Sequence, residues 1–172
     1  MKLVVLMKEC FDVLDENRNH LGYTKERGET LLENEYNTGA EGFIISHNLL
    51  LITQRSMNKS HAGMWEVPGG CSQAGETTYD TLKREMLEEV GVEINQNNIK
   101  FLGTKIYKKQ FVDIFQIQTD IDIHQIKIQE EEVSDAKFVN KEEFNQLVQE
   151  NKIVPSVLER WNYIKDQVDL NW

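Results

Sequence analysis

The sequence predicts an α/β or α+β fold in which a sheet packs against helices. Strand-like segments lie on both sides of one amphipathic mid-chain helix, and helical segments follow at the end of the chain. A length of 172 residues suits one domain with an apolar core. We therefore expect a single domain over residues 1–172, with an N-terminal hairpin and loop over about 1–37, a core over about 38–140 and C-terminal helices over about 141–172.

The first part of the chain predicts a β-hairpin. Residues 11–14 are mostly apolar and run into a polar turn at 15–17, and residues 21–24 are expected to return as the second strand. The polar stretch 25–37 is expected to form a loop or a short helix.

A second hairpin is expected in the middle of the sheet. Residues 42–46 and 49–53 are apolar runs separated by the polar pair 47–48, which is typical of two central strands joined by a tight turn. The sequence Pro68-Gly69-Gly70 that follows predicts a loop, because proline and glycine interrupt regular structure.

The strongest helix prediction begins near Thr77. Apolar side chains recur at intervals of three or four residues, at Tyr79, Leu82, Met86 and Val90. Thr77 or Thr78 is expected to cap the start of this helix, and Gly91 is expected to end it.

Beyond this helix the sequence predicts strands and then helices. Residues 100–107, 112–119 and 121–128 are expected to be strands. In the tail, Asn140 with Glu143 predicts the start of one helix, and Ser156 with Glu159 predicts a capping box for another. The segment from 156 to 172 is expected either to pack on the core or to support a homodimer.

Composition narrows the class of partner. The formal net charge is −10, which argues against broad binding to nucleic acid or to anionic membranes, although a divalent metal could still attract a phosphorylated substrate. Two cysteines make no disulfide framework, and the apolar start of the chain is too short for a signal-peptide core or a membrane span. We expect a cytoplasmic protein.

Three glutamates on the predicted helix carry the most chemical information. Glu85, Glu88 and Glu89 stand at i, i+3 and i+4, so they should share one face, expected opposite the apolar stripe. Like charges at this spacing destabilise a helix by a few tenths of a kcal/mol per pair, a penalty that a hard cation such as Mg²⁺ reverses. Arg84 is placed to orient one carboxylate. The alternative is an ordinary solvated acidic face.

The surroundings of these glutamates resemble the Nudix box, G-x5-E-x7-R-E-U-x-E-E-x-G-U. Residues 70–92 match all seven of its residue-specific positions. At average composition, the probability of such a match by chance is about 10⁻⁸ per starting position. The approach sequence 63–70 is also similar to that family, and a looser resemblance extends from about residue 11 to about residue 161.

The resemblance implies a Nudix fold, with a mixed β-sheet sandwiched between helices and the box as loop–helix–loop. It implies Mg²⁺ or Mn²⁺ held by Glu85, Glu88 and Glu89, with the Gly70 carbonyl as a further ligand. The reaction implied is attack of metal-activated water on a phosphorus of a small-molecule diphosphate. The general base is expected to be Glu85 or Glu88, with the run that contains Glu131 and Glu132 as an alternative; that run also fits a solvated loop.

Residues outside the glutamate cluster are candidates for substrate contact. Arg55 aligns with a basic residue that meets phosphate in relatives, although a surface arginine fits as well, and Lys59 is a weaker candidate. Glu76 is expected to support the loop or to contact metal or substrate. Trp65 could stack on a base or sugar, and the alternative is a core aromatic.

Two rival functions remain open on the sequence. Segments 11–17, 35–36 and 51–56 look like Nudix proteins related to isopentenyl diphosphate isomerase, with Asn37 where a histidine commonly stands. The isomerase needs a catalytic cysteine, and that position falls at Gly69 rather than at Cys71, which we expect to be inert. The other rival is a non-catalytic nucleotide-binding module, which would usually lack a box glutamate.

Overall fold

The main sheet is mixed and has one long central strand. The structure, a computed structural model, describes residues 8–172, so the first seven residues, including the apolar start discussed above, lie outside it. Within this range the sheet consists of β3 (Asn37–Ser46), β4 (Leu49–Arg55), β5 (Trp65–Glu66), β6 (Gly69–Cys71), β7 (Ile99–Tyr107), β8 (Gln110–Thr119) and β9 (Val133–Val139). The strand order is β5-β4-β3-β8-β7, with β6 added to β3 and β9 to β4. Only β3 and β8 pair in parallel among these strands.

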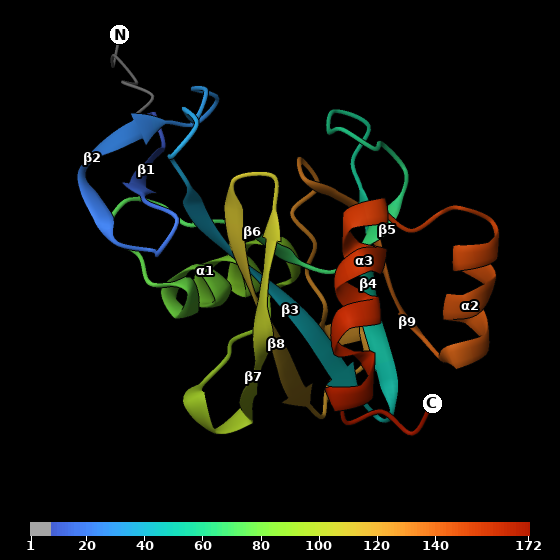
Figure 1. Ribbon diagram of the computed structural model, residues 1–172. Helices are drawn as coiled ribbons and strands as arrows, with labels where there is room; N and C mark the ends of the chain where they lie inside the picture. The colour runs from blue at the N-terminus through green and yellow to red at the C-terminus, as the bar shows by residue number, and fades with distance from the viewer. Residues whose placement is uncertain (1–7) are drawn as a thin grey trace, which may run out of the picture.

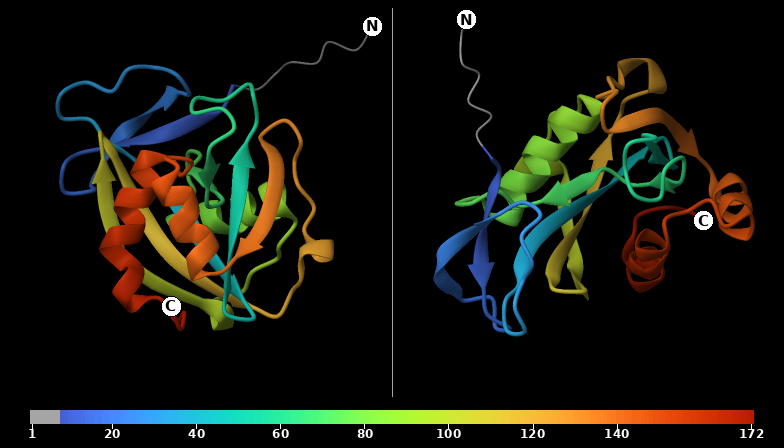
Figure 2. Two further views of the ribbon diagram at one scale, coloured as in Figure 1. Left: turned by 90° about the vertical axis from the view of Figure 1, so that its right-hand side faces the viewer. Right: turned by 90° about the horizontal axis from the view of Figure 1, so that it is seen from above.

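Helices cover both faces of this sheet, which confirms the predicted fold class (Figure 1). Figure 2 shows α1 (Thr78–Val90) on one side, and α2 (Lys141–Gln149) and α3 (Pro155–Ile164) on the other. Each side has its own apolar core because side chains alternate along β3. Ile44 packs with Leu82 and Met86 of α1, whereas Phe43 and Ile45 pack with the α2 and α3 side chains.

The N-terminal hairpin is also confirmed. It consists of β1 (Cys10–Leu14) and β2 (His20–Glu26), paired antiparallel. The turn between them is tied to the sheet by Arg18, whose guanidinium donates two 2.9 Å hydrogen bonds to Asp113 of β8. Asp113 also accepts from Thr78 at the start of α1 (2.7 Å), so one buried carboxylate joins the hairpin, the sheet and the helix.

The predicted ends of α1 are correct. The Thr77 side chain accepts from the Asp80 backbone N–H while Asp80 accepts from the Thr77 N–H, which is a capping box. Gly91 ends the helix in the left-handed region, at φ 70°, and its N–H donates to the Leu87 carbonyl. Asn140 and Glu143 form the predicted cap of α2.

Other sequence predictions are wrong. Residues 121–128 form no strand; the Asp122 side chain accepts from the His124 N–H and starts a short 3₁₀ helix, η2 (Ile123–Gln125). The chain then runs along the end of α1, where the Gln129 N–H donates to the Glu89 carbonyl. The longest of the strands that the prediction missed is β9, which follows this crossing and pairs with β4.

Two local predictions near prolines also fail. Ser156 does not cap α3: the helix begins two residues earlier than that cap would place it, with Val154 at the N-cap position and Pro155, whose missing N–H costs nothing there, in the first turn. Residues 69 and 70 belong to the short strand β6 rather than to a loop. Two further 3₁₀ helices, η1 (Gln96–Asn98) and η3 (Lys165–Gln167), complete the elements, and no helix within residues 8–172 is long and apolar enough to cross a membrane.

A buried ion pair fixes α3 to the central strand. The Arg160 Nε donates to Glu41 of β3 at 2.6 Å, and its Nη2 donates to the other carboxylate oxygen. Both residues are almost fully buried, at 6% and 8% exposure. Burial raises the pKa of Glu41, and the guanidinium opposes that shift. Without Arg160 this buried carboxyl would therefore lose both of the hydrogen bonds that compensate its burial.

Replacing Arg160 tests this dependence. We expect Arg160→Met to lower the free energy of unfolding by about 3–5 kcal/mol, because it leaves a buried carboxyl unpaired. Urea unfolding followed by tryptophan fluorescence measures the loss. The double variant Glu41→Gln/Arg160→Met is expected to lose less than Arg160→Met alone, since no charge remains to be buried. Equal losses in the two variants would contradict the role given to the pair.

Candidate active site

Strand β6 begins with two glycines, so its backbone can lie directly against helix α1. It pairs antiparallel with β3, so that Gly70 stands opposite Ala40. A Cβ atom at Gly70 would lie 2.2 Å from the Glu85 Oε1, and one at Gly69 would lie 2.3 Å from the Ala40 carbonyl oxygen. Neither position has room for a side chain. Glycine is therefore required here for the carboxylate of α1 to approach the strand.

The three helix glutamates differ in their exposure. Glu85 and Glu89 are 9% and 3% exposed, whereas the Glu88 side chain is 50% exposed. The expectation that all three lie opposite the apolar stripe is wrong, because at 100° per residue Glu85 and Glu89 fall next to Leu82 and Met86. They face β6, where the Glu89 Oε2 accepts from the Gly69 N–H at 3.1 Å. Glu88 lies at the open edge of this group.

Arg84 connects the carboxylates. Its Nη1 donates to Glu85 at 2.7 Å and to Glu88 at 3.3 Å. Its Nε and Nη2 donate to the two oxygens of Glu76 at 2.7 and 3.0 Å, and Nη2 also donates to the Cys71 carbonyl at 3.1 Å. One guanidinium thus holds the helix, the preceding loop and β6 in a fixed relation.

Glu76 is part of the loop rather than of an open surface. Besides Arg84, its Oε2 accepts from the Gln73 N–H and from the Thr81 hydroxyl, at 2.8 and 2.9 Å. Burial acts against ionisation, but these hydrogen bonds prevail and lower the pKa of Glu76. Its carboxylate therefore stays charged and faces Arg84, which places it as a support for the site.

The two buried glutamates are poorly compensated. Burial, and then the negative charge of Glu85, raise the pKa of Glu89 to about 8. Burial also raises the pKa of Glu85, although Arg84 opposes this. The nearest cation to Glu89 is Lys59, whose Nζ lies 3.9 Å from Oε1. Two carboxylates that repel each other in a buried setting favour an added positive charge.

A second acidic group reaches the site from the loop before β9. The Glu132 side chain is paired with the Lys59 ammonium, the same group that approaches Glu89. This hydrogen bond lowers the pKa of Glu132. Glu131 is exposed, and its backbone carbonyl accepts from the Ser56 hydroxyl. Of these two candidates, Glu132 is the one whose carboxylate is linked to the helix glutamates, through Lys59.

A cavity of about 420 Å³ opens beside Gly69 and Gly70. Its lining includes basic side chains from several parts of the chain, namely Arg27, Arg55, Lys59, Lys108 and Arg160. The acidic lining residues, Glu41 and Glu66, are each paired with an arginine. The lining thus has five basic and two acidic side chains, and Arg27, Arg55, Lys59 and Arg160 are each already paired with a carboxylate.

The structure brings some of the predicted substrate residues to this cavity and leaves one out. Arg55 lines it, and its guanidinium is held by Glu66 at 2.5 Å and by the Ser60 carbonyl at 2.6 Å. Tyr107 and His61 also line it. Trp65 is 7% exposed within the apolar core, where it packs with the α2 and α3 side chains, so its ring faces away from a substrate.

Several lining residues were not identified from the sequence. Arg27 and Lys108 stand in polar loops and carry no motif. Glu41 offered a signal that went unused, because a charged residue inside the otherwise apolar run 39–46 requires a partner. Its partner, Arg160, lies 119 residues away, and no local pattern marks it.

The donor set fits a hard divalent cation. Within residues 8–172 no group of three acidic, histidine or cysteine side chains is gathered into a ready metal cage. Mg²⁺, however, is commonly bound by one or two carboxylates together with water and substrate phosphates. Glu85, buried against Gly70, and Glu89, buried at the Gly69 N–H, provide two such carboxylates, and Glu88 stands at the open side.

Comparison with known proteins assigns most of the chain to one family. The NUDIX domain family matches residues 37–160. An uncharacterized Nudix hydrolase of Listeria monocytogenes is 31% identical over 150 residues, which is 86% of this chain and 89% of the relative. The 8-oxo-dGTP diphosphatase of Proteus vulgaris is 40% identical over 50 residues, 29% of this chain and 45% of that protein.

Solved structures share the fold at lower identity. A protein of Deinococcus radiodurans superposes with a TM-score of 0.71 at 21% identity, over 85% of this chain and 92% of that one. The NUDIX domain of Shewanella oneidensis NrtR, solved with ADP ribose, gives 0.61 at 18% identity, over 77% and 88%. The family match over residues 37–160, together with 31% identity across most of a relative, shows that this chain belongs to the Nudix hydrolase family.

Proposed function

We propose that the chain hydrolyses the diphosphate bond of a nucleoside-diphosphate-linked or related small molecule in a reaction that depends on Mg²⁺ or Mn²⁺. The observation that carries this proposal is the packing of the Glu85 carboxylate against Gly70, with the buried Glu89 beside it. No stability argument explains two adjacent buried carboxylates, since burying like charges is costly. A cation shared with a diphosphate explains them.

The metal would be held by Glu85, Glu88 and Glu89, with the Gly70 carbonyl as a further ligand. When bound, it supplies positive charge that lowers the pKa of a water and neutralises charge developing on the diphosphate. Arg84 orients Glu85 and Glu88 through the hydrogen bonds described above. Glu76 keeps Arg84 in place from the other side. Arg84 is thus a positioning residue.

Hydrolysis requires a group that accepts a proton from the attacking water. As the water oxygen bonds to phosphorus, the bridging P–O bond breaks and the released proton must pass to a base. Glu88 suits this role because it is half-exposed and has only a 3.3 Å contact with Arg84, and Glu85 is the alternative. Glu132 is less suited because it is already paired with Lys59.

The basic side chains of the cavity would receive the phosphates. Lys59 reaches from the cavity lining to within 3.9 Å of Glu89, so it connects the cationic surface with the carboxylates. Arg55 also lines the cavity, and its Nε, Nη1 and Nη2 already donate to Ser60 and Glu66, so those contacts fix its position there. Two related proteins support a nucleoside as part of the substrate. One is named an 8-oxo-dGTP diphosphatase, and the other was solved with ADP ribose.

The isomerase alternative has less support. The position that would need its cysteine is Gly69, where a Cβ atom would lie 2.3 Å from a backbone oxygen. Cys71, the nearest thiol, accepts a hydrogen bond from the Gln110 amide and lies one strand position beyond Gly70. A non-catalytic binding module is disfavoured because Glu85, Glu88 and Glu89 are all present.

Removing metal or the half-exposed glutamate tests the proposal. We expect hydrolysis of one member of a panel of nucleotide sugars, dinucleotides, nucleoside triphosphates and prenyl diphosphates, and loss of that activity in EDTA. Glu88→Gln should lower kcat by about 10²–10⁴, because the proton acceptor is lost. Glu93→Gln, an exposed position just beyond α1, is the matched control and should keep wild-type turnover. Hydrolysis that persists in EDTA, or equal rates for the two variants, would contradict the proposal.

The glycine of β6 gives an independent test. Gly70→Ala places a methyl group where the Glu85 carboxylate lies, so it should displace that carboxylate and lower kcat by about 10². Gly22→Ala is the control, because Gly22 has φ 84° and open space around its Cα. It should cost about 1–2 kcal/mol of stability through backbone strain but leave turnover intact. Full activity in Gly70→Ala, with the fold checked by circular dichroism, would remove Glu85 from the site.

A further inference from the structure

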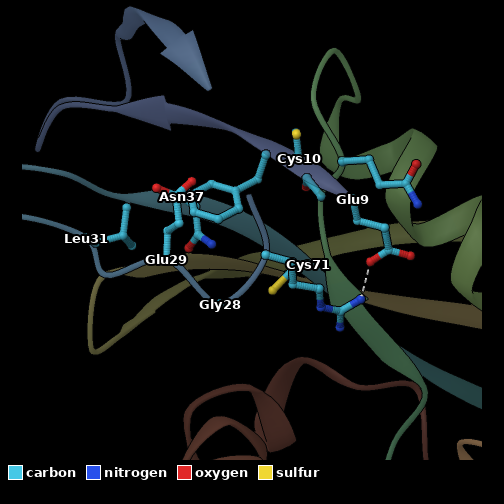
Figure 3. Close-up of a pocket in the computed structure, with 11 residues that line it drawn as sticks. Glu9, Cys10, Gly28, Glu29, Leu31, Asn37 and Cys71 are labelled. Atoms are coloured by element: carbon cyan, nitrogen blue, oxygen red, sulfur yellow. Dashed lines mark hydrogen bonds and ion pairs between the residues drawn. The ribbon is translucent and has the colours of Figure 1, made fainter. Parts of the chain in front are cut away.

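Arg27 reaches the active-site cavity from the N-terminal hairpin. It directly follows β2, and its backbone N–H donates to the carbonyl of Glu9, just before β1, at 2.8 Å. Its side chain lines the cavity together with Gly70 and Cys71, and it also lines a smaller pocket of about 150 Å³ beside the hairpin (Figure 3). The match to the NUDIX domain family begins at residue 37, so this cation comes from outside the matched segment.

The loop after β2 holds the backbone of Arg27 in place. The buried Glu35 carboxylate at the end of this loop accepts from the Lys25 ammonium and from the Leu32 N–H, the latter at 2.7 Å. The Lys109 ammonium donates to the Leu32 carbonyl, which ties the loop to the turn between β7 and β8. The main chain at Arg27 is therefore fixed, whereas its side chain is 58% exposed.

Glu9 is the carboxylate that pairs with Arg27, and Figure 3 marks this ion pair with a dashed line. The Glu9 side chain is 48% exposed, so both members of the pair are open to water. Exposed ion pairs contribute little to stability, because solvent screens the attraction and both side chains lose conformational freedom. Arg27 can therefore exchange Glu9 for another anion at little cost to the fold.

The other paired cations of the cavity are held more firmly. The side chains of Arg160, Arg55 and Lys59 are 8%, 16% and 23% exposed, and each lies within 4 Å of a buried or half-buried carboxylate. Moving one of these cations toward a ligand would leave that carboxylate without its counter-charge, which is costly. Releasing Arg27 leaves only the exposed carboxylate of Glu9, which water can solvate.

The charge of Arg27 also reaches the acidic residues of the site. The pKa of Glu132 is lowered mainly by its hydrogen bond with Lys59, and the positive charges of Arg27 and Arg55 add to this effect. Lys59 in turn lies 3.9 Å from the Glu89 carboxylate. An anion placed beside these groups would therefore also be attracted by Arg27.

We propose that Arg27 binds a phosphate of the diphosphate substrate by exchanging Glu9 for that phosphate, so that Glu9 is an internal competitor of the substrate. This inference rests on the proposed function and adds to it a specificity residue supplied by the hairpin. A guanidinium can donate two parallel hydrogen bonds to two phosphate oxygens, and a diphosphate carries more negative charge than one carboxylate. The exchange therefore favours the substrate, and no covalent bond changes in it.

Binding of imidodiphosphate, a diphosphate that resists hydrolysis, tests the inference without turnover. Isothermal titration with Mg²⁺ present should show about tenfold weaker binding by Arg27→Met than by the wild type, because a charge-assisted hydrogen bond is lost. Glu9→Gln should instead bind imidodiphosphate about two- to fivefold more tightly, because Arg27 loses its competing partner. A pair that only stabilised the hairpin would give changes in the same direction, since both variants break the same contact.

The Lys8–Glu26 pair supplies matched controls. It belongs to the same hairpin, is also exposed to water, and lies outside both the cavity and the small pocket. Lys8→Met and Glu26→Gln repeat the two changes of charge, and they should leave imidodiphosphate binding within about twofold of the wild type, because salt screens distant exposed charges. Circular dichroism should show an unchanged fold in all four variants.

The outcomes separate this inference from the proposed function. The inference is wrong if the wild type does not bind imidodiphosphate, if Arg27→Met binds it like Lys8→Met, or if Glu9→Gln fails to tighten binding. If a diphosphate is hydrolysed with an unchanged KM in Arg27→Met, the inference fails and the proposed function stands; a raised KM with an unchanged kcat supports both. If nothing on the substrate panel is hydrolysed but Arg27→Met and Glu9→Gln change imidodiphosphate binding in opposite directions, Arg27 remains a diphosphate-binding residue and the proposed function fails.

Discussion

The contact between two glutamates of α1 and the bare backbone of β6 sets the geometry of the whole site. Glu85 occupies the space where a side chain of Gly70 would lie, and Glu89 accepts from the neighbouring Gly69 N–H. Both carboxylates are buried. Burial, and then the charge of Glu85, raise the pKa of Glu89 to about 8. The fold tolerates this because the rest of α1 packs Leu82 and Met86 deep in an apolar core.

Rigid support around this contact comes from a network centred on Arg84. The guanidinium donates to Glu76, Glu85 and Glu88, and also to a carbonyl of β6. Glu76 is fixed in turn by Gln73 and Thr81, so the loop, the strand and the helix cannot shift independently. Such fixed orientation lets a site stabilise charge without reorganising during the reaction.

The features that depend on local or fixed residue spacing could be predicted from the sequence. The carboxylates, Arg84 and both ends of α1 follow from residue spacing within 70–92, and the fold class follows from the order of the elements. Features that depend on contacts between residues far apart in the sequence could not be predicted. The segment 121–128 looks like a strand by composition, yet hydrogen bonds to the end of α1 hold it in another path. The Glu41–Arg160 pair, the Lys59–Glu132 pair and the unpartnered Asn37 arise only from folding.

The distribution of charge explains how an acidic chain can select small anions. The net charge of −10 disfavours a large polyanion, which would meet repulsion over most of the surface. The cavity is an exception because its basic side chains come from unrelated elements: the loop after β2, the end of β4, the loop after β4, the turn between β7 and β8, and α3. Because these basic side chains outnumber the two acidic ones only within the cavity lining, any attraction for an anion is confined to a small space. This constraint favours a small phosphorylated substrate over a polyanion.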